Sequence, residues 1–75
     1  MMHTTSELLR TLRGERTQRE IAASVGIAPS AYSMYERGER TPRDRIKRKI
    51  ASLYGISVQE LFFDSTELDN IEREQ

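Results

Sequence analysis

Seven of the twelve lysine and arginine residues lie between Arg37 and Lys49, and cations at this density can bind phosphate groups. Phosphate contacts of this kind supply much of the affinity of proteins for nucleic acids. Acidic side chains at Glu36, Glu39 and Asp44 lie among or beside these cations. A run of charges is also commonly no more than a solvated surface. The composition alone therefore leaves phosphate binding and simple solvation as alternatives.

The sequence indicates neither an enzyme nor a metal-binding protein. It has no cysteine, and its single histidine, His3, has no second potential ligand placed to share a metal ion with it. The chain contains no glycine-rich phosphate loop and no nucleophile beside a base. A helical domain of 75 residues also has little room for a cleft that encloses a substrate. We therefore expect no catalytic residue, no metal ion and no cofactor.

The formal net charge of zero is the sum of two oppositely charged parts of the chain. Residues 1–63 carry eleven basic and seven acidic residues, a net charge of +4, whereas residues 64–75 carry one and five, a net charge of −4. This asymmetry is typical of a basic functional domain followed by an acidic tail. The tail over 64–75 is either a solvated extension or a short helix, for which Leu68 and Ile71 supply apolar side chains three residues apart.

Nothing in the sequence predicts export or a membrane location. No apolar run approaches the roughly 20 residues that a membrane-spanning helix needs, and the first residues lack the apolar centre of a signal peptide. The absence of cysteine is usual in a reducing compartment. We therefore expect a cytoplasmic protein.

The elements that must position these cations are predicted to be helices. Four pairs of residues have the spacing of a capping box, in which a Ser or Thr side chain and an acidic residue three positions later bond to each other's backbone. These pairs are Thr4–Glu7, Thr17–Glu20, Thr41–Asp44 and Ser57–Glu60. Pro29 and Pro42 also suit the first position of a helix. The sequence predicts an all-α fold with helices over residues 5–13, 18–25, 29–37, 42–54 and 58–63.

Apolar residues recur at helical spacing in each of these segments, so each helix can turn one face to a shared core. These faces consist of Leu8, Leu9 and Leu12; Ile21, Ala22 and Val25; Tyr32 and Tyr35; Ile46, Ile50, Leu53 and Tyr54; and Val58, Leu61 and Phe62. Phe63 cannot share a helix face with Phe62, so it is a candidate for a subunit interface or for packing under the tail. Lys47, Arg48 and Lys49 are expected to be solvated and to favour the later part of a helix.

The segment from residue 17 to residue 38 has the pattern of two short helices that cross steeply. Ala22 is small enough to let the helices approach closely, Gly26 can form a tight turn, and Ile27 enters the core just after it. Tyr32 and Tyr35 fall on the inner face of the second helix, which leaves its outer face exposed. This arrangement lets a recognition helix enter the major groove of DNA.

These residues resemble the Cro/C1-type (Xre) helix-turn-helix family. The matching motifs are Thr17-Gln18-x-Glu20-Ile21-Ala22, Gly26-Ile27, Ser33-x-Tyr35-Glu36-Arg37-Gly38-x-Arg40-x-Pro42, Ile50-Ala51 and Tyr54-Gly55-Ile56-Ser57-Val58-x-Glu60-Leu61-Phe62. The resemblance covers about residues 7–63 and implies a compact five-helix, lambda-repressor-like DNA-binding domain over residues 1–63. The chain departs from the usual pattern at Ala28, where a capping Ser or Thr is common, and at Tyr32, which replaces Ile or Val.

The resemblance also implies roles for individual residues. Exposed positions that face the base edges correspond to Pro29, Ser30, Ser33 and Met34. Positions that contact phosphates correspond to Gln18, Arg37, Arg40 and Arg43. Glu36 matches a glutamate that pairs inside the domain with an arginine of the first helix, here Arg13. Because hydroxyl and apolar groups cannot form the bidentate base contacts of Arg, Asn or Gln, we expect more reliance on phosphates, water and DNA shape.

The function predicted from these features is that of a homodimeric transcriptional repressor on a palindromic operator in double-stranded DNA. Phe63, Leu68 and Ile71 are the candidates for the dimer interface. One alternative is an antitoxin, in which the acidic tail binds a toxin; a protein antagonist is likewise a conceivable partner. A second alternative is a protein-interaction module that uses the same helices without DNA.

Overall fold

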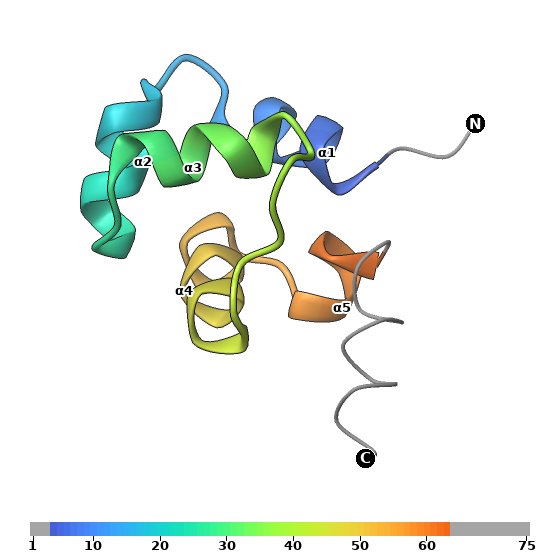
Figure 1. Ribbon diagram of the computed structural model, residues 1–75. Coiled ribbons are helices and arrows are strands. Elements are labelled where there is room, and N and C mark those ends of the chain that lie inside the picture. Colours follow the sequence, from blue (N-terminus) through green and yellow to red (C-terminus); the bar gives the residue numbers. More distant parts are fainter. Residues whose placement is uncertain (1–3, 64–75) are drawn as a thin grey trace.

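The structure, a computed structural model, describes residues 4–63 of the chain. Within this part the chain forms five helices and no strand, as the sequence predicted (Figure 1). The helices are α1 (Thr5–Arg13), α2 (Gln18–Val25), α3 (Pro29–Glu36), α4 (Asp44–Tyr54) and α5 (Val58–Leu61). None of them is long and apolar enough to cross a membrane. The acidic tail predicted over 64–75 lies outside the described residues.

Hydrogen bonds between near neighbours fix the starts of three helices. In each, a Ser or Thr hydroxyl accepts from the amide three residues later, and the glutamate at that position accepts from the amide of the cap residue. The three pairs are Thr4–Glu7, Thr17–Glu20 and Ser57–Glu60. Because each cap satisfies backbone groups that the first turn of a helix leaves without partners, these starts are set by local sequence alone.

The fourth predicted capping pair, Thr41–Asp44, is wrong. Helix α4 begins at Asp44 instead of residue 42, and its N-cap residue, Arg43, makes no side-chain capping bond. Pro42 is buried in the connection and not placed in the first turn. Figure 1 shows this connection crossing the molecule from the end of α3 to the start of α4. An extended segment spans about 3.3 Å per residue against about 1.5 Å for a helix, which suits this crossing.

Two helix ends also differ from the prediction by one or two residues, whereas the bounds of α1 and α2 and the end of α4 are as predicted. Helix α3 ends at Glu36, and α5 ends at Leu61 instead of residue 63. Phe62 has left the helical conformation (φ −108°, ψ 35°), and its side chain is buried in the core. The next residue, Phe63, is half-buried.

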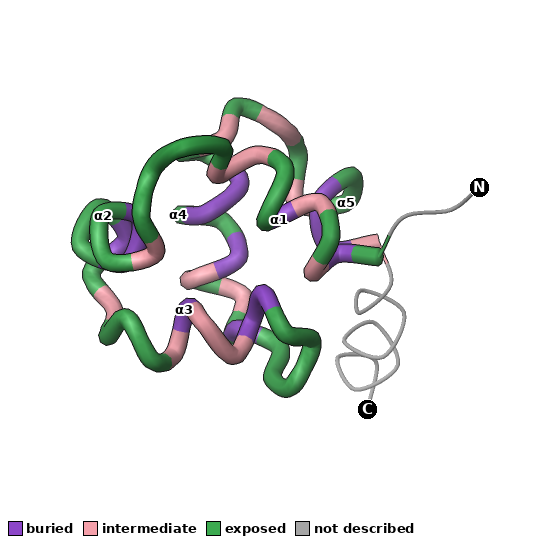
Figure 2. Tube along the Cα trace, turned by 90° about the horizontal axis from the view of Figure 1, so that it is seen from above, coloured by how far each residue is buried: buried purple, intermediate pink, exposed green. Residues whose placement is uncertain are grey.

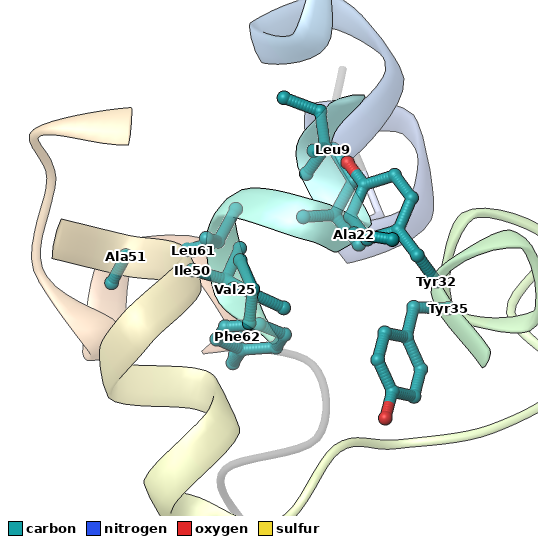
Figure 3. Packing of buried hydrophobic residues seen from close by; sticks show 10 residues of the cluster. Leu9, Ala22, Val25, Tyr32, Tyr35, Ile50, Ala51, Leu61 and Phe62 are labelled. Atoms are coloured by element: carbon teal, nitrogen blue, oxygen red, sulfur yellow. The ribbon is translucent and has the colours of Figure 1, made fainter. Parts of the chain in front are cut away.

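All five helices contribute to one hydrophobic core (Figure 3). Its buried apolar side chains are Leu9, Ile21, Ala22, Val25, Tyr32, Tyr35, Ile50, Ala51, Leu61 and Phe62. Most of the predicted inner faces are therefore correct, and the remaining predicted apolar residues pack at its edge, with one exception on α4. Burial of this apolar surface is the main driving force for folding in so small a domain.

Two predictions about the burial of side chains on α4 are wrong. Leu53, expected in the core, is 36% exposed, whereas Lys47, expected in solvent, is only 2% exposed. The inner face of α4 runs through Lys47, Ile50, Ala51 and Tyr54, so Leu53 falls to one side of it. The ammonium group of Lys47 lies 5.7 Å from the centre of the Phe62 ring, where the ring face attracts a cation.

Candidate nucleic-acid interface

The turn between α2 and α3 sets the angle at which α3 is presented. Gly26 has the left-handed backbone conformation (φ 84°, ψ 34°), and its amide donates to the carbonyl of Ala22 over 2.8 Å. The amide of Ile27 donates to the same carbonyl over 3.0 Å, and the Ile27 side chain packs against the core. Ala22 is fully buried, and its small side chain lets α2 approach its neighbours closely. Any residue other than glycine at position 26 would be strained in this backbone conformation.

Helix α3 has two chemically different sides (Figure 2). Tyr32, Tyr35 and Glu36 are buried, and the two tyrosine rings meet edge to face with centroids 6.4 Å apart. The residues that the family resemblance assigned to the bases lie elsewhere on the helix. Pro29 and Ser30 are exposed, and Ser33 and Met34 are half-buried. Ala28 is the N-cap residue of α3 and makes no side-chain capping bond, because its methyl group has no hydrogen-bond acceptor.

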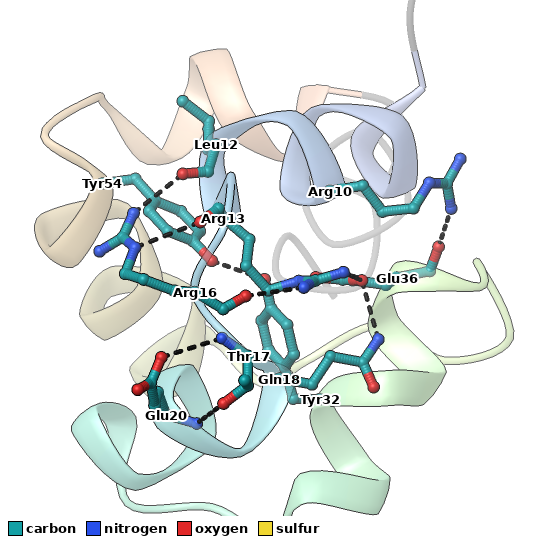
Figure 4. Close-up of polar contacts among 10 residues, drawn as sticks. All are labelled: Arg10, Leu12, Arg13, Arg16, Thr17, Gln18, Glu20, Tyr32, Glu36 and Tyr54. Atoms are coloured by element: carbon teal, nitrogen blue, oxygen red, sulfur yellow. Dashed lines mark hydrogen bonds and ion pairs between the residues drawn. The ribbon is translucent and has the colours of Figure 1, made fainter.

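The buried carboxylate of Glu36 lies where α1, α2 and α3 meet (Figure 4). Arg13 of α1 donates from Nε to Oε2 over 2.7 Å and from Nη2 to Oε1 over 3.1 Å. Gln18 of α2 donates from Nε2 to Oε1 over 2.9 Å. Burial by itself would raise the pKa of Glu36, but the hydrogen bonds from Arg13 and Gln18 outweigh it and hold the pKa below its ordinary value. Glu36 is therefore a carboxylate that ties the end of α3 to the other two helices.

Sequence reasoning missed a second arginine of α1 at this junction. Arg10 donates from its guanidinium to the backbone carbonyl of Glu36, close to the end of α3. Arg10 and Arg13 are three residues apart on α1 and therefore lie on the same face of that helix. That spacing is the sequence signal that could have identified Arg10 beside the predicted Arg13–Glu36 pair.

A pair of tyrosine hydroxyl groups connects α3 to α4. The hydroxyl oxygens of Tyr32 and Tyr54 are 2.6 Å apart, and burial raises the pKa of both phenols. Tyr32 thus uses its additional polar atom within the core, where the family usually has a branched aliphatic residue. The guanidinium of Arg16 lies 5.4 Å from the centre of the Tyr54 ring and donates to the carbonyls of Leu12 and Arg13 at the end of α1 (Figure 4). The sequence analysis assigned no role to Arg16.

The three arginines assigned to phosphates are all exposed. Arg37 follows the end of α3, and Arg40 and Arg43 lie in the connection to α4. Arg37 Nη2 is 3.1 Å from Oε1 of Glu39, but both side chains are more than half exposed. An ion pair in such a position contributes little to stability, so the Arg37 guanidinium remains available to a stronger anion.

The remaining predicted residues divide between the described and the undescribed parts of the chain. Phe63 is half-buried, whereas Leu68 and Ile71 lie outside the described residues. Within residues 4–63 no three potential ligands come together to hold a metal ion.

A protein-family model described as helix-turn-helix matches residues 9–61. The chain is 37% identical over 62 residues to the cryptic phage CTXphi transcriptional repressor RstR of Vibrio cholerae. The aligned residues cover 80% of this chain and 56% of RstR. It is 36% identical over 53 residues to an uncharacterized HTH-type transcriptional regulator of Archaeoglobus fulgidus. Here the aligned residues cover 69% of this chain and 76% of that protein. The chain thus spans little more than half the length of RstR, and no solved structure matches it.

Proposed function

The chain belongs to the Cro/C1-type helix-turn-helix family of transcriptional regulators, and on this premise we propose that it binds double-stranded DNA and represses transcription as a homodimer. The family comprises regulators and not enzymes, in agreement with the expectation that the chain is no catalyst. Beyond family membership, the proposal depends on which side of α3 the core leaves exposed.

The observation that carries the proposal is the division of α3 into a buried and a free side. Tyr32 and Tyr35 hold the helix to the core, while Pro29 and Ser30 face solvent near its start. The major groove of DNA is about 12 Å wide, and a helix with its side chains measures about 10–12 Å across. With the end of α3 fixed through Glu36, its first turns are the part free to enter such a groove.

Phosphate contacts on either side of α3 would supply most of the affinity. Arg37, Arg40 and Arg43 follow α3 and are exposed, so they can reach one backbone of the duplex. Gln18 donates one N–H of its amide to Glu36, and the second N–H can donate to a phosphate oxygen. Glu36 would then hold both Gln18 and α3 in register with the DNA. Each phosphate neutralised by a cation makes binding weaker at higher salt.

Base recognition would rest on hydroxyl and apolar groups. Ser30 and Ser33 can each donate to or accept from a base edge, and the apolar surface of Pro29 or Met34 can contact a thymine methyl group. None of these side chains forms the bidentate contacts worth about 1–3 kcal/mol of discrimination. Sequence-dependent DNA shape would therefore carry part of the specificity.

We propose a homodimer because one such helix reads only a short half-site. Two α3 helices related by a two-fold axis would enter successive major grooves about 34 Å apart, which requires a palindromic operator. Phe63 is the described candidate for the interface, because its aromatic side chain is only half-buried within the single chain. A dimer that occupies a promoter would deny it to RNA polymerase, and RstR is itself named as a repressor.

The proposal is tested by selecting bound fragments from genomic DNA with the purified protein at physiological salt. We expect a symmetric motif whose two halves are one helical turn apart, and an affinity that falls steeply as salt increases. Failure to bind any duplex, or binding that does not change with salt, would refute it.

Two variants separate the proposed roles on the recovered operator. Ser33→Ala should change the preference at one base pair in each half-site, whereas Arg40→Gln should weaken binding equally for all sequences. If both variants have the same effect on a panel of mutated operators, the assignment of α3 to the bases is wrong.

A further inference from the structure

A shallow groove lies between the second half of α2 and the outer side of α4. Residues 23–26 form its α2 wall. Its α4 wall consists of three cations, a serine and a leucine, namely Arg45, Arg48, Lys49, Ser52 and Leu53. Leu53 is the one exposed large hydrophobic residue within the described part of the chain. No acidic side chain lines the groove, so it combines positive charge with exposed apolar surface.

None of the residues assigned to DNA bases or phosphates lines the groove, and Val25 is the one core residue that does. Arg45, Arg48 and Ser52 lie on the side of α4 opposite to Lys47 and Ile50, which face inward. Both views of the molecule place α4 between α2 and α5 (Figures 1 and 2). The groove thus opens on one side of α4, and the chain leaves α5 on the other side.

The composition of residues 64–75 is complementary to that of the groove. They carry five acidic side chains against one arginine, together with Leu68 and Ile71 as apolar residues. Three cations and an exposed leucine in the groove match this composition in both charge and apolar character. We propose that residues 64–75 dock in the groove between α2 and α4 of their own chain. This assigns Leu68 and Ile71 to contacts with Leu53 and not to a second subunit.

The length of the segment permits this path. Leu68 and Ile71 follow Phe63 by five and eight residues, which span about 17 and 26 Å when extended, whereas α4 with its side chains is about 10–12 Å across. The segment starts beside α4, because α5 packs against it. Because the segment is joined covalently to the domain, its local concentration at the groove is in the millimolar range. A weak, charge-based contact therefore forms within one chain more readily than between two.

The chain contains no cysteine, so a pair of introduced cysteines reports directly on this contact. We suggest Ser52→Cys in the groove with Asn70→Cys in the tail, because these changes leave every charge and apolar anchor in place. The full-length double variant is followed in a glutathione redox buffer by the rate at which the intramolecular disulfide forms. The matched control is the same pair with Arg45→Glu and Arg48→Glu, which keeps the tether and reverses the charge of two exposed cations.

We expect the disulfide to form on the order of tenfold faster in the unaltered groove than in the charge-reversed one, because docking adds to the concentration that the tether alone provides. Circular dichroism shows whether the control still folds. A second arm needs no further substitution: raising the salt from 0.1 M to 1 M shortens the Debye length from about 10 Å to about 3 Å and should slow the reaction.

Equal rates in both backgrounds and at both salt concentrations would overturn the proposal. Mixing the two single-cysteine variants tests a second copy as the occupant. If the mixture forms a crosslinked dimer faster than the double variant closes on itself, the segment docks on another chain and the proposal is wrong. No DNA is present in these measurements, so their outcome is independent of the proposed repressor function.

Discussion

Replacing Glu36 with glutamine should destabilise the domain, because the side chain keeps its shape but loses an acceptor. Oε1 of Glu36 accepts from both Arg13 and Gln18, and Oε2 accepts from Nε of Arg13. An amide has a single oxygen. Even in its better orientation, with that oxygen in the place of Oε1, the NH₂ group of Glu36→Gln would face the donor Nε of Arg13.

The expected loss is about 2 kcal/mol. A hydrogen bond to a charged group contributes about 1.5–3 kcal/mol. The carboxylate has 2% of its side chain exposed and Arg13 has 22%. Arg13 can therefore recover some contact with water, which places the loss below the roughly 3–5 kcal/mol of a fully buried broken pair. In a domain of this size about 2 kcal/mol corresponds to a fall in Tm of about 8–16 °C.

The same variant predicts a change in pH dependence. The folded protein holds the pKa of Glu36 below its ordinary value of 4.5, so the ionised carboxylate contributes its full stability above that pH. As the pH falls through the lowered pKa, the folded state also takes up the proton and the contribution is lost. The difference in Tm between the native protein and Glu36→Gln should therefore be largest near pH 7 and should narrow toward pH 3.

Thermal unfolding followed by circular dichroism at both pH values provides the test. Glu39→Gln is the matched control, because Glu39 is also paired with an arginine but is 57% exposed, and its loss should cost at most about 0.5 kcal/mol. A fall of less than about 4 °C for Glu36→Gln, or a difference that does not change with pH, would refute the reasoning.

Other variants test the packing and the binding surface. Tyr32→Phe and Tyr54→Phe should show a coupling of about 1 kcal/mol in a double-mutant cycle measured by urea unfolding, since each hydroxyl is the other's partner; a coupling near zero would contradict this. Ala22→Leu should lower the free energy of unfolding by about 1–3 kcal/mol, because it overfills the contact between α2 and its neighbours. Ala23→Leu, at an exposed position of the same helix, should leave the urea midpoint unchanged. Arg43→Gln should preserve Tm but reduce the salt slope of DNA binding by about 0.9, and an unchanged slope would exclude its phosphate contact.

The sequence determined the helices wherever their ends depend on neighbouring residues. Three capping pairs and the glycine turns after α2 and α4 involve atoms no more than a few residues apart. The motif around Gly26 is equally local, because both hydrogen bonds of the turn return to Ala22. Such features can be read from order and spacing alone, and the family follows from the same ordered residues.

The start of α4 shows where this local reasoning ends. Thr41 and Asp44 have a capping spacing, yet the helix does not begin until Asp44, and Arg43 before it is extended. The path that residues 40–43 must take between α3 and α4 decides their conformation. Local propensity is weaker than such a tertiary requirement.

Only the tertiary structure decided which polar groups meet. The donors to Glu36 come from positions 23 and 18 residues earlier in the chain, and Tyr32 finds Tyr54 on another helix. The burial of Lys47 depends on the ring of Phe62, which reaches it because α5 folds back against α4. These contacts depend on distances between helices, and helical periodicity specifies the face of a residue but not what another helix places opposite it.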